Sequence, residues 1–233
     1  MSINEEQSTA STRVILVRHG ETVCNIEGKY QGRIDSPLTP KGERQALCVA
    51  KSLEAYNIAK IYSSPLKHAL RTAEIIRGKR NIEIATDRRL LEIDCGEWEG
   101  VTFRDVQEQY PKELEIWEQE PHKHVMPGGE ALMDVYMRVS EAFTDIAERN
   151  KGKTVVIVSH LVLIMLCMVH CAGEKAADLW RTQNQGNAAI NVVEVDAGNK
   201  IRIITRGDCS HLGQEDFSFE NWQSWTWDED GTR

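Results

Sequence analysis

Long apolar segments are missing from this sequence, which excludes a protein held in a membrane by spanning helices. The longest strictly apolar run, from Leu161 to Val169, is far shorter than the roughly 20 residues that cross a bilayer. The segment from Met1 to Thr12 is polar and lacks the apolar centre of a secretory signal. We therefore expect a cytoplasmic protein without a membrane partner, in which residues 1–12 are disordered.

Closely spaced cysteine pairs are also absent, which argues against a disulfide framework. The chain of 233 residues has six cysteines but no C-x-x-C motif, and it is long enough to fold without disulfides. Cys167, His170 and Cys171 lie in or beside the apolar run and are expected to be buried helix residues rather than metal ligands. His122 and His124 have no further ligand suggested nearby, so we expect a solvated loop there.

An excess of positive charge is missing as well. Lysine and arginine number 28 against 36 aspartates and glutamates, which gives a net charge of −8. This charge argues against general nucleic-acid binding, because that function needs a basic face. A small anionic substrate stays compatible, since a few converging arginines set the local potential. Internal repeats and low-complexity linkers are not visible either, so one large domain or two small ones are expected.

The most informative feature that is present is an apolar run ending in charged residues. Four bulky apolar residues, Val14 to Val17, predict a strand buried on both faces of a parallel sheet. Arg18 and His19 follow at its carboxyl end, where ligands bind in open α/β sheets, and Gly20 lets the chain turn sharply. A guanidinium matches phosphate oxygens, and a neutral imidazole can attack phosphorus. The motif therefore indicates phosphate chemistry.

Strands and helices alternate along the rest of the chain, which favours βαβ units and a parallel sheet. Thr39 and Pro40 predict a helix cap followed by proline in the first turn, and Ser64 with Pro65 predict the same for a second helix. An apolar stripe predicts a long helix over residues 132–146. Further strands are expected at residues 58–62, 154–158, 189–195 and 201–205.

Several motifs come in a fixed order after the first. They are Leu16–Thr22 with Asn25, Tyr62–Leu66 with Ala69–Ala73, Leu91–Ile93 with Gly96–Gly100, Pro127–Glu130, and Val156–His160. Together they resemble the histidine phosphatase superfamily, also called phosphoglycerate mutase-like, over residues 13–212. The resemblance implies an α/β fold, a three-layer αβα sandwich with a mostly parallel central sheet. Residues 213–233 form an acidic, tryptophan-rich tail, which we expect to pack on this domain.

The resemblance implies a phosphatase that splits phosphomonoesters through a covalent phosphohistidine. His19 would be the nucleophile. Glu92 would protonate the leaving oxygen and then activate the water that hydrolyses the intermediate. Arg18 and His160 would surround the phosphoryl oxygens, and the apolar strand before His160 directs it to the same edge of the sheet as His19.

Further residues would contact a small phosphorylated metabolite, the partner that the resemblance implies. Asn25 would donate its amide to a phosphoryl oxygen, and Gln31 with Gly32 lies on the following loop within reach of substrate. No metal or other cofactor is required by the resemblance, because the arginine and the histidines supply the positive charge.

This chain departs from the family pattern on the phosphate-binding side. His68 stands where the family usually carries a phosphate-binding arginine, and an imidazole is shorter and largely neutral at pH 7. Arg71 lies on the same helical face, so our hypothesis is that His68 contacts phosphate and Arg71 restores part of the missing charge. Leu161 replaces a usual glycine. Its N–H would still reach phosphate at a helix start, while its side chain narrows the pocket.

Two alternative functions stay open. A phosphoglycerate mutase must keep water from its phosphohistidine, and the mutase branch normally carries a long insertion where only residues 101–127 stand here. That short interval favours a phosphatase. A non-catalytic module that binds a phosphorylated ligand is the second alternative, suggested by His68 and Leu161. The sequence also leaves a homo-oligomer open and does not name the phosphomonoester.

Overall fold

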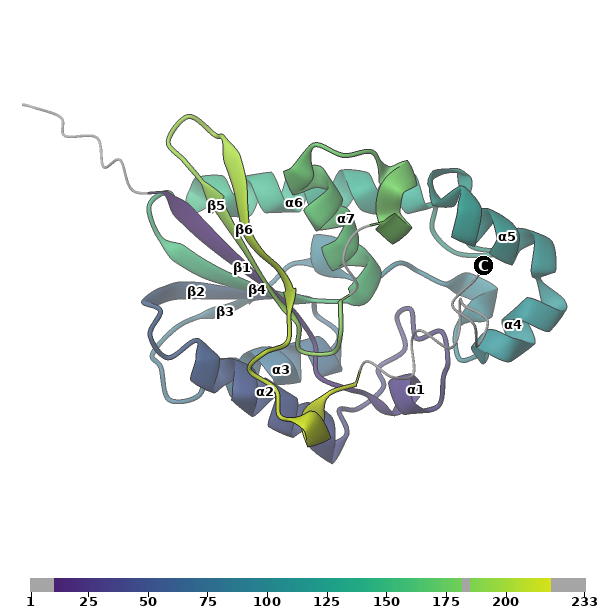
Figure 1. The fold of residues 1–233 in the computed structure, drawn as a ribbon, viewed down its shortest axis with the longest axis horizontal. Helices are drawn as coiled ribbons and strands as arrows, with labels where there is room; N and C mark the ends of the chain where they lie inside the picture. Colours follow the sequence, from purple (N-terminus) through teal and green to yellow (C-terminus); the bar gives the residue numbers. More distant parts are fainter. Residues whose placement is uncertain (1–10, 182–184, 219–233) are drawn as a thin grey trace, which may run out of the picture.

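The computed structural model describes residues 11–181 and 185–218, and a six-stranded sheet forms its centre (Figure 1). Along the chain, the strands are β1 (Thr12–Arg18), β2 (Ile58–Ser63), β3 (Ile84–Thr86), β4 (Thr154–Ser159), β5 (Ile190–Val195) and β6 (Ile201–Asp208). Their order in space is β3-β2-β4-β1-β5-β6. Strands β3, β2, β4 and β1 are parallel, and β5 and β6 run antiparallel at one edge. The mostly parallel sheet predicted from the sequence is confirmed.

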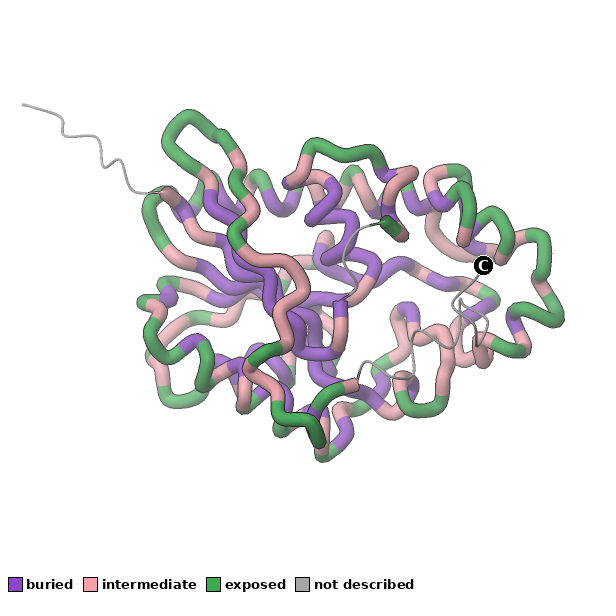
Figure 2. The backbone as a smooth tube through the Cα atoms, in the orientation of Figure 1, coloured by how far each residue is buried: buried purple, intermediate pink, exposed green. Residues whose placement is uncertain are grey.

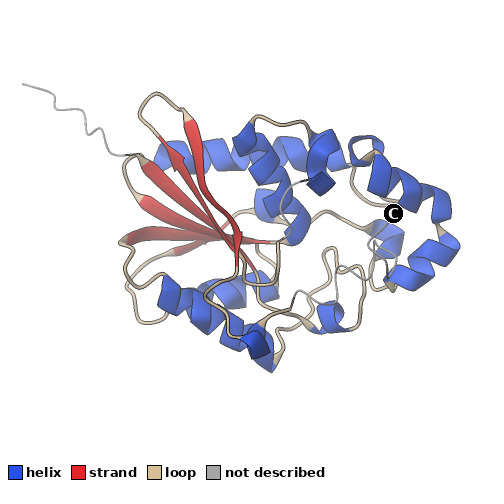
Figure 3. Cartoon of the chain, viewed as in Figure 1, coloured by secondary structure: helices blue, strands red, loops and turns tan. Residues whose placement is uncertain are grey.

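Helices cover both faces of this sheet, with α6 and α7 on one side and α2 and α3 on the other (Figures 1 and 3). The helices are α1 (Val23–Ile26), α2 (Pro40–Ser52), α3 (Lys67–Arg77), α4 (Phe103–Gln109), α5 (Pro111–Gln119), α6 (Leu132–Arg149) and α7 (Leu161–Ala172). Short 3₁₀ turns lie at Arg88–Leu90, Gly96–Trp98, Pro121–Lys123, Ala176–Arg181 and Gln214–Asp216.

Side chains of β1 alternate between the two cores that this arrangement creates. Val14 and Leu16 pack among residues of α6 and α7, whereas Ile15 and Val17 pack among residues of α2 and α3. All four are almost completely buried, as are most residues of the central strands in Figure 2. Burial on both faces explains why the strand is a continuous apolar run, and it confirms the predicted three-layer sandwich.

The two predicted helix starts have different outcomes. Thr39 caps α2 as predicted, because its hydroxyl accepts a 3.0 Å hydrogen bond from the N–H of Gly42 and Pro40 occupies the first turn. The predicted cap at Ser64 and Pro65 is wrong, since α3 begins at Lys67 and no side-chain cap comes from its N-cap residue. Asp35 accepts a 2.9 Å hydrogen bond from the N–H of Lys67 instead. The cap therefore comes from a loop distant in sequence.

Residues 101–127 fold into α4 and α5, two helices that the sequence patterns did not predict. Each helix buries one side chain, Val106 in α4 and Trp117 in α5, which is too few for a visible apolar stripe. The solvated loop expected around His124 is wrong. This side chain is 3% exposed, and its ring lies 5.4 Å from that of Trp98 and 5.3 Å from that of Trp117.

Helix α7 is buried over nearly its whole length, as predicted for the apolar run. Cys167 and Cys171 are buried in the core, and His170 is half-buried beside the rings of Tyr136 and Phe143. None of the helices within residues 11–181 and 185–218 combines the length and the apolar character that crossing a bilayer requires.

The first residues of the expected tail pack against α2. Asp216 is buried. It accepts a 3.0 Å hydrogen bond from Nε of Arg44, and its carbonyl accepts one of 2.7 Å from Nε2 of Gln45. The three tryptophans of the tail, Trp222, Trp225 and Trp227, lie outside the described residues, so the packing expected for them stays a prediction.

Candidate active site

The candidate site lies where β1 and β4 end side by side. Arg18 is the last residue of β1 and pairs in register with Ser159, the last residue of β4. The next residue of each chain segment is a histidine, and the rings of His19 and His160 lie 5.3 Å apart. Adjacent parallel strands thus bring together two side chains that are far apart in sequence, as the motifs predicted.

Gly20 is required here for close packing rather than for the sharp turn that the sequence suggested. Its φ is not positive, unlike that of the glycines in turns. A Cβ at this position would lie 2.3 Å from the carbonyl oxygen of Gly42 at the start of α2. The absence of a side chain lets the segment after His19 pass directly against this helix.

His19 is held as a neutral imidazole with one nitrogen available. Its Nδ1 lies 2.8 Å from the carbonyl oxygen of Gly20, and a carbonyl only accepts hydrogen bonds, so Nδ1 carries the proton and Nε2 carries the lone pair. Burial is the main cause that lowers the pKa of His19 well below 6.5, followed by electrostatic interactions with His68, His160 and Arg18. This is the form of histidine that a nucleophile needs.

Glu92 is a buried carboxyl group that lines the same cavity as His19. Burial raises its pKa above the ordinary 4.5, while hydrogen bonds from the N–H groups of Ile93 and Val162 and the charges of Arg18 and Arg138 oppose that shift. Its Oε1 accepts from the N–H of Ile93 at 3.0 Å, and Oε2 accepts from that of Val162 at 3.2 Å. A carboxyl group with a raised pKa is suited to donate a proton.

Arg18 brings a buried positive charge to the same cavity. The side chain is 9% exposed, and Nη1 donates to the carbonyl of Gln185. Within the described part of the chain, its Nε has no hydrogen-bond partner. Burial lowers the pKa of Arg18 to about 10, opposed by the nearby Glu92, so the guanidinium remains charged at neutral pH.

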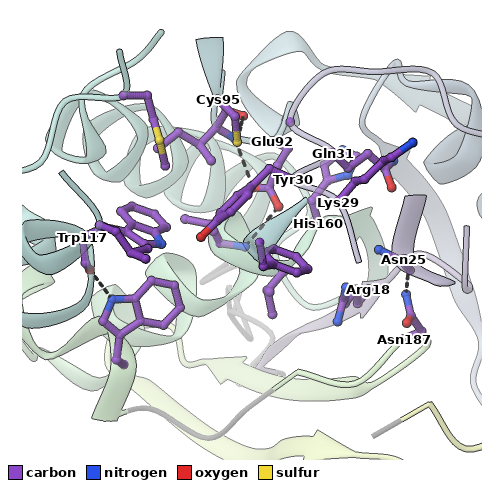
Figure 4. A pocket seen from close by; sticks show the side chains of 18 of the residues that line it. Arg18, Asn25, Lys29, Tyr30, Gln31, Glu92, Cys95, Trp117, His160 and Asn187 are labelled. Carbon is purple, nitrogen blue, oxygen red and sulfur yellow. Dashed lines mark hydrogen bonds between the residues drawn. The ribbon is translucent and has the colours of Figure 1, made fainter. Parts of the chain in front are cut away.

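Asn25 is oriented by a residue that the sequence patterns did not single out. Oδ1 of Asn25 accepts from the N–H of Thr22 at 3.1 Å and from Nδ2 of Asn187 at 3.0 Å. With its oxygen used in this way, the side chain turns its amino group to the cavity (Figure 4). Asn187 also lines the cavity. The one sequence signal for it is a polar cluster, Gln185 to Asn187, just before a strand.

His68 lies beside the two other histidines and is almost completely buried. Its ring centroid is 4.4 Å from that of His19, and its Nε2 is 3.2 Å from Nδ1 of His160. Nε2 of Gln31 lies 3.0 Å from the same nitrogen of His68. Burial is the largest cause that lowers the pKa of His68 to about 4, and Asp35 opposes it. His68 is therefore neutral at pH 7.

The structure does not bring Arg71 to this cluster, although the helical spacing suggested it. Nη2 of Arg71 forms a 2.9 Å ion pair with Glu43 of α2, and Nη1 lies 3.7 Å from Glu74. The side chain is 52% exposed, and the described residues that line the cavity do not include it. An acidic partner on the neighbouring helix thus holds its charge at the surface.

The cavity extends well beyond the charged cluster, with a volume of about 810 Å³. Gln31, Gly32 and Leu161 line it as expected. The rest of the lining combines aromatic and apolar side chains with charged and polar ones. The first group is Tyr30, Phe103, Leu114, Trp117, Met126 and Trp180, and the second includes Arg104, Gln107, Glu115 and Glu118. Figure 4 shows Arg18 and Asn25 at one end and Trp117 at the other. A phosphate group would fill one end and leave room for a larger organic group or for water.

A sequence model of the histidine phosphatase superfamily (branch 1) matches residues 14–206. The chain belongs to this superfamily. Phosphoserine phosphatase 1 of Hydrogenobacter thermophilus is 35% identical over 202 residues, which cover 87% of this chain and 95% of that protein. The family resemblance seen in the motifs is thereby confirmed.

Solved structures of histidine phosphatases and related proteins share the fold. Bacillus stearothermophilus YhfR is 39% identical, with a TM-score of 0.83 over 87% of this chain and all of that one. A mutant phosphoserine phosphatase from Entamoeba histolytica, solved with phosphoserine, is 30% identical with a TM-score of 0.77 over 87% of this chain and 100% of that one. The phosphoglycerate mutase-like architecture expected from the sequence is confirmed.

Proposed function

We propose that this protein is a phosphatase that hydrolyses small phosphomonoesters through a phosphohistidine on His19. The observation that carries the proposal is that a neutral imidazole and a carboxyl group of raised pKa, both buried, line one cavity. The lone pair on Nε2 of His19 attacks phosphorus, and Glu92 gives its proton to the leaving oxygen. The carboxylate left on Glu92 then takes a proton from the water that attacks the phosphohistidine.

Arg18 and Asn25 bind the phosphoryl oxygens in this proposal. Arg18 offers a guanidinium whose Nε has no hydrogen-bond partner among residues 11–181 and 185–218, and Asn25 offers its amino group. His160 contributes once phosphate has arrived, because a dianion favours the protonated form of a neighbouring imidazole. A phosphatase rather than a mutase is favoured by the cavity of about 810 Å³, which leaves space for water beside a small substrate.

The substrate that we propose is a small phosphorylated metabolite of the phosphoserine or phosphoglycerate kind. Two structures of one relative support this choice, since Entamoeba histolytica phosphoserine phosphatase has been solved with phosphoserine and with 3-phosphoglyceric acid. Both ligands carry a carboxylate beside the phosphate. Lys29 and Lys41 line the cavity of this chain. They pair with Glu27 and Glu21, and in this proposal they exchange these partners for the carboxylate of the substrate.

Phosphate release from a panel of phosphomonoesters, measured with EDTA and with His19→Ala in parallel, tests the proposal. We expect turnover in the wild type, none in the variant, and a phosphoenzyme that is labile in acid and stable in base. His122→Gln, outside the cavity, should keep full activity. Isomerisation of 3-phosphoglycerate without phosphate release would assign a mutase instead. Tight phosphate binding without turnover of any ester would assign a binding module.

A further inference from the structure

Three histidines from separate elements converge at one point, and two of them, His19 and His160, line the cavity. His19 follows β1, His68 belongs to α3 and His160 precedes α7. One ring nitrogen from each lies within 4.8 Å of the other two. All three side chains are at most 4% exposed. Such a grouping of imidazoles is the typical ligand set of a zinc-class metal ion.

Hydrogen bonds around the cluster leave lone pairs on two of the three rings. The N–H of His19 is taken by the carbonyl of Gly20, so its Nε2 can only accept. Nε2 of His68 lies 3.0 Å from the amide nitrogen of Gln31, which is a donor, so this ring nitrogen accepts as well. His19 thus has the arrangement common among metal-binding histidines, with the other ring nitrogen donating to a backbone carbonyl.

His160 adds an unused donor atom to the cluster. Its Nδ1 lies 3.2 Å from Nε2 of His68. Because that nitrogen of His68 accepts, Nδ1 of His160 carries the proton and Nε2 carries the lone pair. Nε2 is buried and has no hydrogen-bond partner among the described residues. A buried polar atom without a partner is costly unless a ligand satisfies it.

The spacing suits a tetrahedral ion after a small movement of the rings. Zinc–nitrogen distances of about 2.0–2.1 Å place two ligand nitrogens about 3.3 Å apart. The widest separation within the cluster, at most 4.8 Å, must close by roughly 1.5 Å. Water or phosphate from the cavity, which His19 and His160 line, would complete the shell.

We propose that His19, His68 and His160 form a site for a zinc-class divalent ion, and that the bound ion switches the phosphatase off. The ion takes the lone pair of Nε2 of His19, so the nucleophile is blocked and substrate competes with the metal. His68 makes the site particular to this chain, because the arginine usual at this position in the family cannot ligate a metal. The inhibitory consequence rests on the proposed function, whereas the metal site itself does not.

Equilibrium dialysis with Zn²⁺ tests the site without reference to activity. The EDTA-treated protein, freed of chelator, should bind one equivalent of Zn²⁺, and Co²⁺ in its place should show the intense visible absorption of a four-coordinate ion. His68→Gln should weaken Zn²⁺ binding by about 100-fold or more. Loss of a residue that only supports a metal ligand costs up to about 100-fold in affinity, and loss of a ligand itself should cost at least as much. The matched control His122→Gln should bind as the wild type does. Wild type that takes up no stoichiometric Zn²⁺, or His68→Gln that binds equally well, would overturn the proposal.

Phosphatase assays with Zn²⁺ or EDTA test the switch. Zn²⁺ in a small excess over the amount that fills the site should lower wild-type activity about tenfold or more. The reason is that only the metal-free fraction of the enzyme turns over substrate. The activity of His68→Arg should be the same in Zn²⁺ as in EDTA, because this variant has no third histidine ligand. Activation by Zn²⁺, or unchanged activity with the ion bound, would overturn the switch. Stoichiometric binding by a protein that hydrolyses nothing in EDTA would instead overturn the proposed function and leave the site standing.

Discussion

The backbone N–H of Val162 donates a hydrogen bond of 3.2 Å to Oε2 of Glu92. Leu163 donates to Oε1 of the same carboxyl group at 3.3 Å, so the first turn of α7 holds Glu92 in place. A helix start favours a negative charge, which limits the rise in pKa that burial causes. Glu92 is thus able to lose its proton to a leaving group and still exist as a carboxylate in the second half of the reaction.

Replacing Glu92 by glutamine should separate the two chemical steps. Glu92→Gln removes the proton donor, and we expect kcat for an alkyl phosphate to fall by about 10²–10⁴-fold. An aryl phosphate with a good leaving group should still phosphorylate His19, since its leaving oxygen needs no proton. Rapid mixing should then show a burst of phenol followed by slow turnover. An equal loss for both esters with no burst would show that Glu92 is not the general acid.

The pH dependence of kcat/KM should be a bell with an acidic optimum. His19 must be deprotonated to attack, and its lowered pKa extends activity to pH values well below 6.5. Glu92 must be protonated to donate, and its raised pKa extends activity to pH values above 4.5. The acidic limb therefore reports His19 and the alkaline limb reports Glu92.

Substrate ionisation can be separated from these two limbs by a variant. The second ionisation of a phosphate, near pH 6, affects every variant equally. The alkaline limb should disappear in Glu92→Gln when an aryl phosphate is used, while the acidic limb stays. An alkaline limb that persists unchanged in this variant would assign it to the substrate.

Arg138 should act as a positioning residue for Glu92. Its Nη1 donates to the carbonyl of Leu91 at 2.6 Å, its Nη2 donates to that of Glu92 at 3.1 Å, and Nε pairs with Glu130 at 2.9 Å. A lysine in Arg138→Lys cannot form these three contacts at once, because it lacks the planar, branched guanidinium group. We expect the unfolding free energy to fall by about 2–3 kcal/mol and kcat to fall with KM nearly unchanged.

Arg149→Lys provides the matched control for Arg138→Lys on the same helix. Arg149 is 69% exposed and pairs with Asp145, so its replacement should change the unfolding free energy by less than about 1 kcal/mol. Thermal melts and steady-state kinetics measure both variants. If Arg138→Lys raised KM and left kcat unchanged, Arg138 would be assigned to substrate binding rather than to the placement of Glu92.

Patterns that are local in sequence predicted the fold and the centre of the site. The stripe from Leu132 to Ile146 is buried along α6 as expected, because helical periodicity depends on neighbouring residues alone. His19 and His160 meet because each directly follows a buried strand, and parallel strands end at the same edge of a sheet. These inferences needed no knowledge of distant contacts.

Features that depend on distant partners could not be predicted in this way. Asp35, rather than Ser64, caps α3, and Glu43 of α2 holds Arg71 at the surface. Asn187 reaches Asn25 across 162 residues of chain. In each case the local sequence was compatible with several hydrogen-bond or ion-pair partners for the side chain. Tertiary packing selected one of them.

Leu161 should influence which esters are accepted. It is the first residue of α7, is half-buried and lines the cavity. Leu161→Gly should raise kcat/KM for bulky esters more than it changes turnover of a small aryl phosphate. Leu161→Ala is the control for the helix, because glycine costs about 1 kcal/mol more than alanine in a helix. Equal changes for bulky and small esters would contradict a role in selection.

Replacing His68 by alanine should lower kcat/KM strongly, whereas replacing Arg71 by alanine should not. His68 contacts the rings of both His19 and His160. His68→Ala, assayed in EDTA, should therefore lower kcat/KM by about 10²-fold. This is the loss typical of removing one group that stabilises charge in a transition state. Arg71→Ala removes an exposed ion pair with Glu43 and should leave kcat/KM unchanged, with the unfolding free energy within about 1 kcal/mol of wild type. A tenfold loss of kcat/KM in Arg71→Ala, absent in Glu43→Gln, would instead show that this arginine leaves its surface partner to bind phosphate.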